Sequence, residues 1–143
     1  MRIAIVGSRN FQDLRQVVVY IYDNLVPGRD VVITGGAQGV DQTAAEAARL
    51  HGCAVVVHEP DYKRYGRGAP LIRNKLIVDD CEQLVAFWDG KSRGTMHTIR
   101  AMREAKRKFL IKLDRDFRDL RKLKEAQTNL FGPRDSEALR SIG

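Results

Sequence analysis

The sequence of 143 residues is poor in cysteine and has no long apolar run. Its only cysteines, Cys53 and Cys81, do not have the spacing of a metal-binding or redox motif, so we expect two reduced, buried thiols. No apolar stretch approaches the roughly 18 residues that a membrane span requires. The chain enters an apolar segment at once, without the pattern of a signal peptide. These absences predict a cytoplasmic protein with no membrane partner, and the length of 143 residues predicts a single domain.

Several common catalytic signatures are also missing. Gly7–Phe11 lacks the second and third glycines of a dinucleotide fingerprint, and Val85 stands where a Walker A loop ending at Gly90–Ser92 would need glycine. There is no Gly-x-Ser-x-Gly motif, and the three histidines do not have a metal-binding spacing. The sequence therefore argues against a P-loop NTPase and a serine hydrolase, and we expect no metal and no cofactor.

Short apolar segments alternate with amphipathic ones along most of the chain. This alternation predicts an α/β protein with a Rossmann-like, doubly wound parallel sheet in one domain. We place that domain at 1–126 and a C-terminal extension at 127–143. The predicted strands are 2–6, 31–34, 54–58, 83–87 and 108–113, and the predicted helices are 12–25, 39–51, 70–80, 94–107 and 115–126.

A glycine-rich turn follows the β-branched segment 31–34. Gly35, Gly36 and Gly39 come directly before a helix rich in alanine. Glycine allows a ligand to approach the backbone, and the free N–H groups and the dipole of a helix N-terminus attract anions. Asp41 follows the turn, either as a capping carboxylate for the helix or as a partner for a ribose hydroxyl.

Three of the predicted strands end in loops of this kind, at 7–9, 35–41 and 88–95. Ligands of parallel α/β sheets bind outside the carboxyl ends of the strands, so these loops are expected to form one site. Ser8 and Ser92 offer hydroxyl groups, and Arg9 and Arg73 can form bidentate pairs with phosphate.

These motifs, taken in order, resemble the YspA-type branch of the SLOG superfamily. The resemblance is carried by Gly7-Ser8-Arg9, by Thr34–Asp41, by Arg73-Asn74 and by Ala86–Thr95. It implies a Rossmann-like fold and a nucleotide or nucleotide-derived ligand. The candidate ligand-binding residues are Gly7, Ser8, Arg9, Gly35, Gly36, Ala37, Gly39, Val40, Asp41, Arg73, Asn74, Asp89, Ser92, Gly94 and Thr95.

The same superfamily contains LOG phosphoribohydrolases and the DNA-processing protein DprA, which leaves the activity open. LOG-type enzymes carry a glutamate where this chain has Thr98, and a hydroxyl cannot replace a carboxylate in glycosidic chemistry. An N-glycosidic-bond hydrolase therefore stays an alternative, with its catalytic residues unknown. DprA shares a Gly35–Asp41-like turn and an Arg-Asn-Arg element similar to residues 73–75, so a single-stranded nucleic-acid-binding protein is the other alternative.

Individual residues keep two interpretations each. Arg73 binds a ligand or pairs with Asp79 or Asp80, and Asn74 binds a ligand or lies on a helix surface. Trp88 is a core-edge residue or a platform for base stacking, and Asp89 also suits a plain turn. The loop 59–69 contains Tyr62 and Tyr65 and could close over a ligand.

Charge and helix patterning suggest two further partners. The net charge is +7, and residues 103–143 hold 12 lysines and arginines against seven acidic residues. This basic C-terminal region predicts weak binding to nucleic acid. Val19, Tyr20 and Tyr22 lie off the buried face of the predicted helix 12–25, which favours a homo-oligomer.

Overall fold

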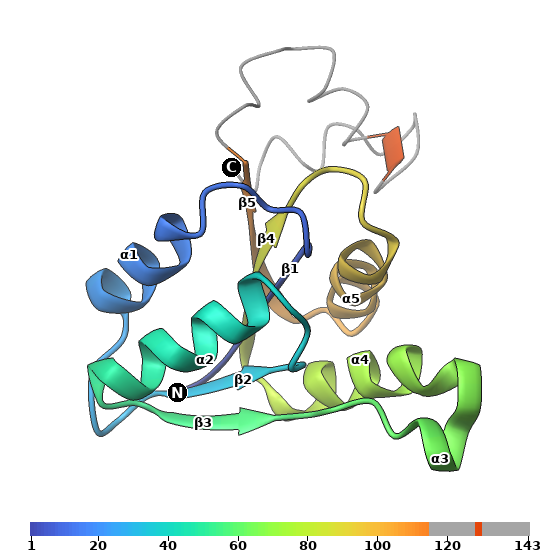
Figure 1. Ribbon diagram of the computed structural model, residues 1–143, viewed down its shortest axis with the longest axis horizontal. Helices are drawn as coiled ribbons and strands as arrows, with labels where there is room; N and C mark the ends of the chain where they lie inside the picture. Colours follow the sequence, from blue (N-terminus) through green and yellow to red (C-terminus); the bar gives the residue numbers. More distant parts are fainter. Residues whose placement is uncertain (115–127, 130–143) are drawn as a thin grey trace.

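A five-stranded parallel sheet forms the centre of the computed structural model, which describes residues 1–114 and 128–129. The strand order is β3-β2-β1-β4-β5, and every neighbouring pair is parallel (Figure 1). The predicted Rossmann-like fold is confirmed, and the strands lie where the apolar segments place them. They are β1 (Arg2–Gly7), β2 (Val31–Thr34), β3 (Ala54–Val57), β4 (Gln83–Trp88) and β5 (Lys108–Leu113).

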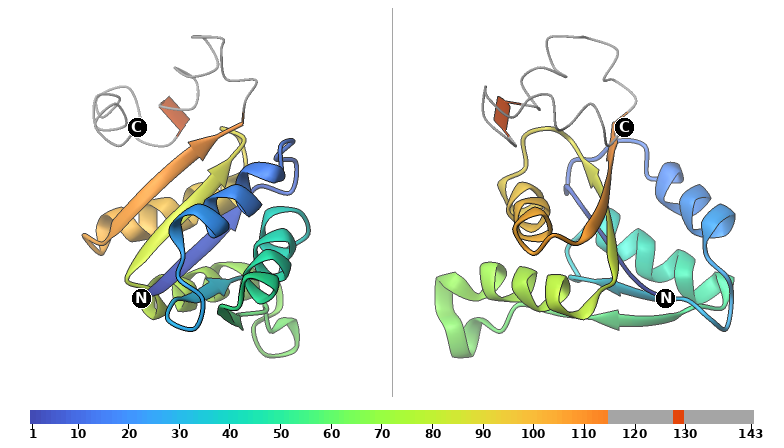
Figure 2. Two further views of the ribbon diagram at one scale, coloured as in Figure 1. Left: turned by 90° about the vertical axis from the view of Figure 1, so that its left-hand side faces the viewer. Right: turned by 180° about the vertical axis from the view of Figure 1, so that it is seen from behind.

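Helices cover both faces of the sheet. Helices α1 (Arg15–Asn24) and α2 (Val40–His51) lie on one face, and α4 (Ala69–Asp80) and α5 (Arg93–Glu104) lie on the other (Figure 2). The direction of winding reverses between β1 and β4, because β1 leads to α1 on one face and β4 leads to α5 on the opposite face. This reversal creates a topological switch point at the carboxyl ends of these two strands.

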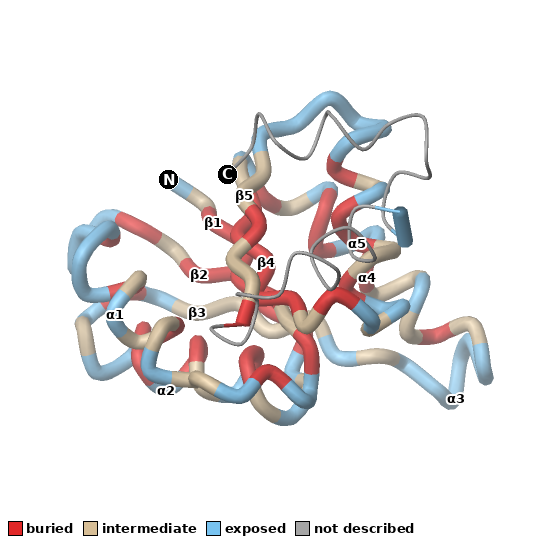
Figure 3. The backbone as a smooth tube through the Cα atoms, turned by 90° about the horizontal axis from the view of Figure 1, so that it is seen from above, coloured by how far each residue is buried: buried red, intermediate tan, exposed pale blue. Residues whose placement is uncertain are grey.

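Each face of the sheet has its own hydrophobic core. Ile3, Ile5 and Phe87 pack with α1 and α2, whereas Val6 and Trp88 pack with α4 and α5. The split follows from the pleat of a strand, in which successive side chains point to opposite faces. Figure 3 shows how strongly burial concentrates in β1 and β4. Both cysteines are buried and free, as predicted.

The structure corrects some of the predicted boundaries. The loop expected at 59–69 contains a short helix α3 (Tyr62–Tyr65) and a 3-10 turn η1 (Gly66–Gly68), because the Asp61 carboxylate accepts the Arg64 N–H and caps the turn. Helix α5 ends at Glu104 instead of 107, since Lys106 has a φ of 55° and reverses the chain toward β5. The predicted helix 115–126 and nearly all of the extension 127–143 lie outside the described residues.

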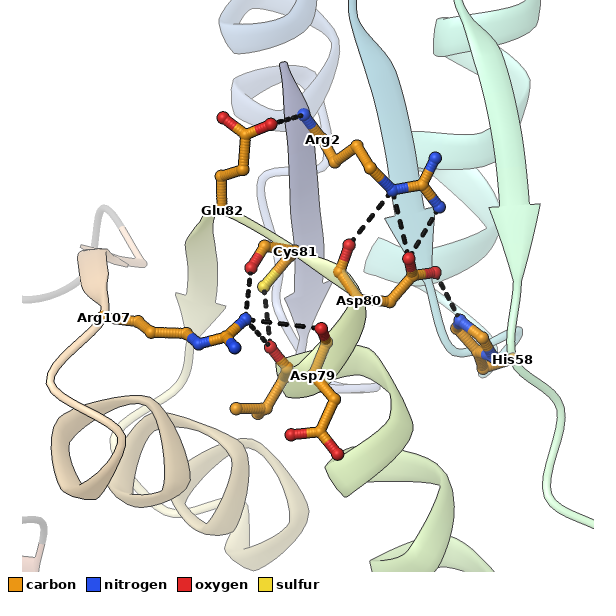
Figure 4. Close-up of polar contacts among 8 residues, drawn as sticks. Arg2, His58, Asp79, Asp80, Cys81, Glu82 and Arg107 are labelled. Carbon is orange, nitrogen blue, oxygen red and sulfur yellow. Dashed lines mark hydrogen bonds and ion pairs between the residues drawn. The ribbon is translucent and has the colours of Figure 1, made fainter.

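A polar cluster fixes the C-terminal end of α4 beside the start of β1 (Figure 4). The Asp80 carboxylate accepts hydrogen bonds from Arg2 (2.7 Å) and pairs with His58 (2.8 Å). Burial raises the pKa of Asp80, but these two partners outweigh it and the net pKa is lowered. Arg107 donates to the carbonyl oxygens of Val78 (2.8 Å) and Cys81 (2.7 Å) at the helix C-terminus. None of the helices in the described part of the chain is long and apolar enough to cross a membrane.

Candidate functional site

A cavity of about 500 Å³ opens at the switch point between β1 and β4. Figure 1 shows the loops after these strands leaving the same edge of the sheet in opposite directions, toward α1 and α5. Ten of the predicted ligand-binding residues line the cavity: Gly7, Arg9, Ala37, Asp41, Arg73, Asn74, Asp89, Ser92, Gly94 and Thr95. The structure therefore brings together most of the candidate ligand-binding residues that the sequence singled out.

Asp41 ties two of the strand-end loops together. One carboxylate oxygen accepts the Gly7 N–H (3.2 Å), and the other accepts the N–H groups of Gly35 (3.0 Å) and Ala37 (3.3 Å). The side chain does not cap its own helix, so the capping interpretation is wrong in that respect: it anchors the loops after β1 and β2. The residue is 4% exposed. Burial raises the pKa of its carboxyl to about 6, although the backbone N–H groups and Arg73 oppose the rise.

Close neighbouring atoms explain two of the glycines at the site. A Cβ at Gly35 would lie 2.7 Å from Arg73 Nη1 and 2.9 Å from Asp41 Oδ2, and a Cβ at Gly7 would lie 2.5 Å from the Phe87 carbonyl oxygen. Gly36 differs from these two glycines. It does not line the cavity, and a Cβ there would lie 3.1 Å from the Val57 side chain. The expectation that Gly36 leaves room for an anion is therefore not met by the geometry.

Helix α4 contributes Arg73 and Asn74 to the opposite wall. Arg73 Nη1 donates to the Gly35 carbonyl oxygen, and Arg73 Nε donates to Asn74 Oδ1 (2.9 Å). The predicted alternative of a pair with Asp79 or Asp80 is wrong: within residues 1–114 Arg73 donates to Gly35 and Asn74 and forms no ion pair with either aspartate, and Asp80 is held by Arg2 and His58 (Figure 4). Asn74 is 5% exposed and its Nδ2 lies 3.4 Å from the Gly94 carbonyl oxygen, so it is not a helix-surface residue.

The loop between β4 and α5 is held by its own polar groups. Asp89 Oδ1 accepts the backbone N–H groups of Lys91 (2.9 Å) and Ser92 (2.8 Å), as in the plain turn considered from the sequence. Trp88 is fully buried and its Nε1 donates to the Ser92 carbonyl oxygen (3.1 Å), so it is a core residue and not a stacking platform. These hydrogen bonds fix the conformation of the loop.

Ser8 has a structural position that the sequence did not suggest. It is 1% exposed, and its Oγ accepts the Asp89 N–H (3.1 Å) while its own N–H donates to the Phe87 carbonyl oxygen (3.0 Å). Ser8 therefore joins the loops after β1 and β4 and does not line the cavity. Gly39 and Val40 also lie outside the lining, as do Gly35 and Gly36.

The N-terminus of α5 faces the cavity through Ser92, Gly94 and Thr95. Its first turn holds no acidic residue, and no side chain among the described residues caps it. The unpaired N–H groups and the dipole of such a terminus favour an anion. Thr98 lines the cavity as well, but its hydroxyl donates to the Gly94 carbonyl oxygen (3.1 Å).

The charge around the cavity is asymmetric. Three cationic side chains line it, from Arg9, Arg73 and Lys91, against the carboxylates of Asp41 and Asp89, which already accept backbone N–H groups. No group of His, Cys, Asp and Glu side chains suited to a metal ion exists within the described ranges. The site is thus arranged to receive a polar ligand that carries negative charge.

Sequence reasoning missed five lining residues: Val6, Asn10, Ile77, Lys91 and Thr98. Lys91 lies in the loop 88–95, Asn10 directly follows the loop 7–9, and Ile77 lies one helical turn after Arg73, so spacing alone could have found these three. The closing loop expected at Tyr62 and Tyr65 is not at the cavity; both residues lie on α3, 58% and 39% exposed.

Solved structures with the same fold include two DNA-processing proteins. DprA from Helicobacter pylori, a protein with a single-stranded DNA binding mode, is 20% identical, with a TM-score of 0.59 over 78% of this chain and 64% of that one. DprA from Streptococcus pneumoniae is 21% identical, with a TM-score of 0.59 over 77% of this chain and 49% of that one. This chain thus spans about half to two thirds of these proteins.

A third solved structure, of the protein TM1055, is 18% identical, with a TM-score of 0.62 over 76% of this chain and 72% of that one. No curated protein sequence matches the chain. Residues 1–65 match the model of the YspA, cpYpsA-related SLOG family (YAcAr). The predicted resemblance to the SLOG superfamily, in its YspA-type branch, is thereby confirmed.

Proposed function

We propose that this protein binds a nucleotide or a nucleotide-derived small molecule in the cavity at the switch point. The observation that carries the proposal is the open N-terminus of α5, which faces the same cavity as three cationic side chains. Binding at a switch point is the general rule for open α/β sheets, and phosphate groups favour helix N-termini. The match to the SLOG family model over residues 1–65 supports a ligand of this class, and the likeness to DprA and TM1055 supports the fold that forms the switch point.

The two walls of the cavity favour different parts of such a ligand. Asp41 already occupies the N–H groups of the loops after β1 and β2, so a phosphate on that side would face a buried carboxylate. On the α5 side no side chain of the described residues caps the helix N-terminus, and the Ser92 hydroxyl and the Lys91 ammonium group lie beside it. We therefore place the phosphate at α5 and the sugar or base toward Asp41 and Asn74.

Arg73→Lys tests this proposal. Lysine keeps the charge but cannot form the fork of hydrogen bonds that guanidinium makes with Gly35, Asn74 and a ligand, so affinity should fall by about 1–3 kcal/mol. Mass spectrometry of small molecules released from the purified protein identifies the first ligands to try, followed by calorimetry with nucleoside mono- and diphosphates. Arg49→Lys, an exposed change on α2, is the matched control. Absence of binding by any nucleotide would contradict the proposal, and wild-type affinity in Arg73→Lys would limit Arg73 to a structural role.

Single-stranded DNA binding is the second candidate function, favoured by the likeness to DprA. The basic surplus of the C-terminal region would give weak binding that falls steeply with salt, because it rests on counterion release. A dedicated DNA-binding protein should keep its affinity near roughly 150 mM salt, since base stacking adds a salt-insensitive contribution. Tight binding under those conditions, in competition with a nucleotide and lost in Arg73→Lys, would make this candidate the better one.

The glycosidic hydrolase receives less support from the cavity. Thr98 is 2% exposed and its hydroxyl is engaged with Gly94, where a LOG-type enzyme would present a carboxylate. Incubation with nucleoside monophosphates and detection of free base would establish such an activity directly.

A further inference from the structure

The outward face of α1 is partly apolar, although the helix is well packed on its other side. Val17 and Ile21 are fully buried, whereas Val19 is 54% exposed and Tyr22 is 47% exposed. A groove of about 530 Å³ runs beside this face toward β5, lined in part by Val19, Tyr20 and Lys112. Helix α1 lies at the outside of the molecule (Figure 2), and no element within the described residues covers this face.

The charges on this face are arranged symmetrically about Val19. Arg15 precedes it by four residues and Asp23 follows it by four, so the three side chains form one stripe along the helix. Arg15 and Asp23 lie roughly 6 Å to either side of Val19, since each residue rises about 1.5 Å. Both border the groove beside the helix.

The signs of these charges are unfavourable within one molecule. A cation in the first turn and an anion in the last turn of a helix both oppose the helix dipole. Helix α1 has no acidic residue in its first turn and no basic residue in its last. Arg15 approaches Asp13 at 3.5 Å, but its side chain is 84% exposed. The stripe is therefore better suited to a partner that presents the opposite order of charges.

A second copy of this chain is such a partner. We propose that two copies dock through α1 in an antiparallel arrangement, about a twofold axis that passes beside Val19. Val19 then faces Val19 of the second copy, and each Arg15 faces the Asp23 across the axis. The dipoles of two antiparallel helices attract one another. A twofold interface also requires a surface that is complementary to itself, and the stripe Arg15–Val19–Asp23 meets this requirement. The groove toward β5 adds area, which a stable interface needs at roughly 800 Å² per partner.

Charge reversal on the intact chain tests the proposal by sedimentation equilibrium and light scattering. We expect the wild-type protein to form a dimer of twice the 16.2 kDa chain mass at micromolar concentration. Arg15→Asp or Asp23→Arg should raise the dissociation constant at least about tenfold, because each change is present twice across the axis. The double variant Arg15→Asp/Asp23→Arg should return to within about threefold of the wild type. Within one chain the two residues are about 12 Å apart along the helix, too far to pair, so such a rescue reports contact between copies.

Val19→Glu provides a second route, with Leu71→Glu as its matched control. Leu71 is 52% exposed on α4, on the opposite face of the sheet, so its substitution should leave the dimer intact while Val19→Glu dissociates it. Circular dichroism and thermal unfolding establish that each variant is folded. A wild-type monomer up to about 100 µM overturns the proposal, and so does a dimer that neither single charge reversal weakens. A double variant that is no tighter than the single ones also overturns it. A groove filled by the C-terminal segment of the same chain would produce the first of these results.

Discussion

Replacement of Asp41 by asparagine should change how stability depends on pH. The buried carboxyl has a pKa of about 6 in the folded protein against an ordinary value of 3.8. A rise of about two pKa units corresponds to about 3 kcal/mol between the protonated and ionised forms. Because the pKa is raised in the folded state, the protonated carboxyl contributes this amount to the free energy of unfolding below pH ~4, and the contribution is lost as the pH rises through about 6. Relative to Asp41→Asn, the wild-type protein should gain about 1 kcal/mol of unfolding free energy between pH 7 and pH 5.

The substitution also has a cost that does not depend on pH. An amide can accept the N–H groups of Gly35 and Ala37 through its oxygen, but its NH2 group would then face the Gly7 N–H. One buried donor left without an acceptor costs about 1–3 kcal/mol. Urea unfolding of both proteins at pH 5, 6 and 7 separates the two effects. The titration of other carboxylates cancels when the free energy of unfolding of the variant is subtracted from that of the wild type at each pH. A difference in unfolding free energy that stays constant over this range would refute the assignment of a raised pKa to Asp41.

Three further changes test other parts of the structure. Gly35→Ala should lower nucleotide affinity about tenfold, because the added Cβ would lie 2.7 Å from the guanidinium group of Arg73. Gly68→Ala is the control: its Cβ would meet open space, so this variant should bind as the wild type does in the same calorimetric titration. Asp80→Asn should lower the free energy of unfolding by about 1 kcal/mol at pH 7, because the carboxylate loses its pairing with Arg2 and His58. The pKa of Asp80 is lowered in the folded protein, so the difference between variant and wild type should disappear as the pH falls through that pKa. Equal stability of the two proteins in urea unfolding at pH 7 would contradict this prediction. Truncation after Asp114 should abolish DNA binding at low salt in a filter-binding assay but leave nucleotide binding intact, and DNA affinity that persists in the folded, truncated protein would locate that surface elsewhere.

Local sequence patterns were sufficient for most of the fold. β-branched and apolar runs predicted all five strands to within one residue, because a strand buried on both faces needs nearly continuous apolar side chains. Alternation with helices then predicted the parallel order. Two of the boundaries that were wrong depend on single residues. Asp61 nucleates α3 by a side-chain cap, and Lys106 ends α5 by adopting a positive φ. Each of these signals rests on one residue and leaves no repeating pattern of apolar side chains, so hydrophobic periodicity could not reveal either boundary.

The sequence by itself determined which loops meet at the candidate site, since the carboxyl ends of parallel strands share one edge of the sheet. The tertiary structure alone decided what each polar residue does there. Asp41 holds an N–H group 34 residues away, and Ser8 accepts an N–H group 81 residues away. Asn74 is buried because α4 packs its polar side against the N-terminus of α5. Residue type and spacing predict that a polar group lies near the cavity. Its partner depends on contacts between segments distant in the sequence, and these contacts exist only once the chain is folded.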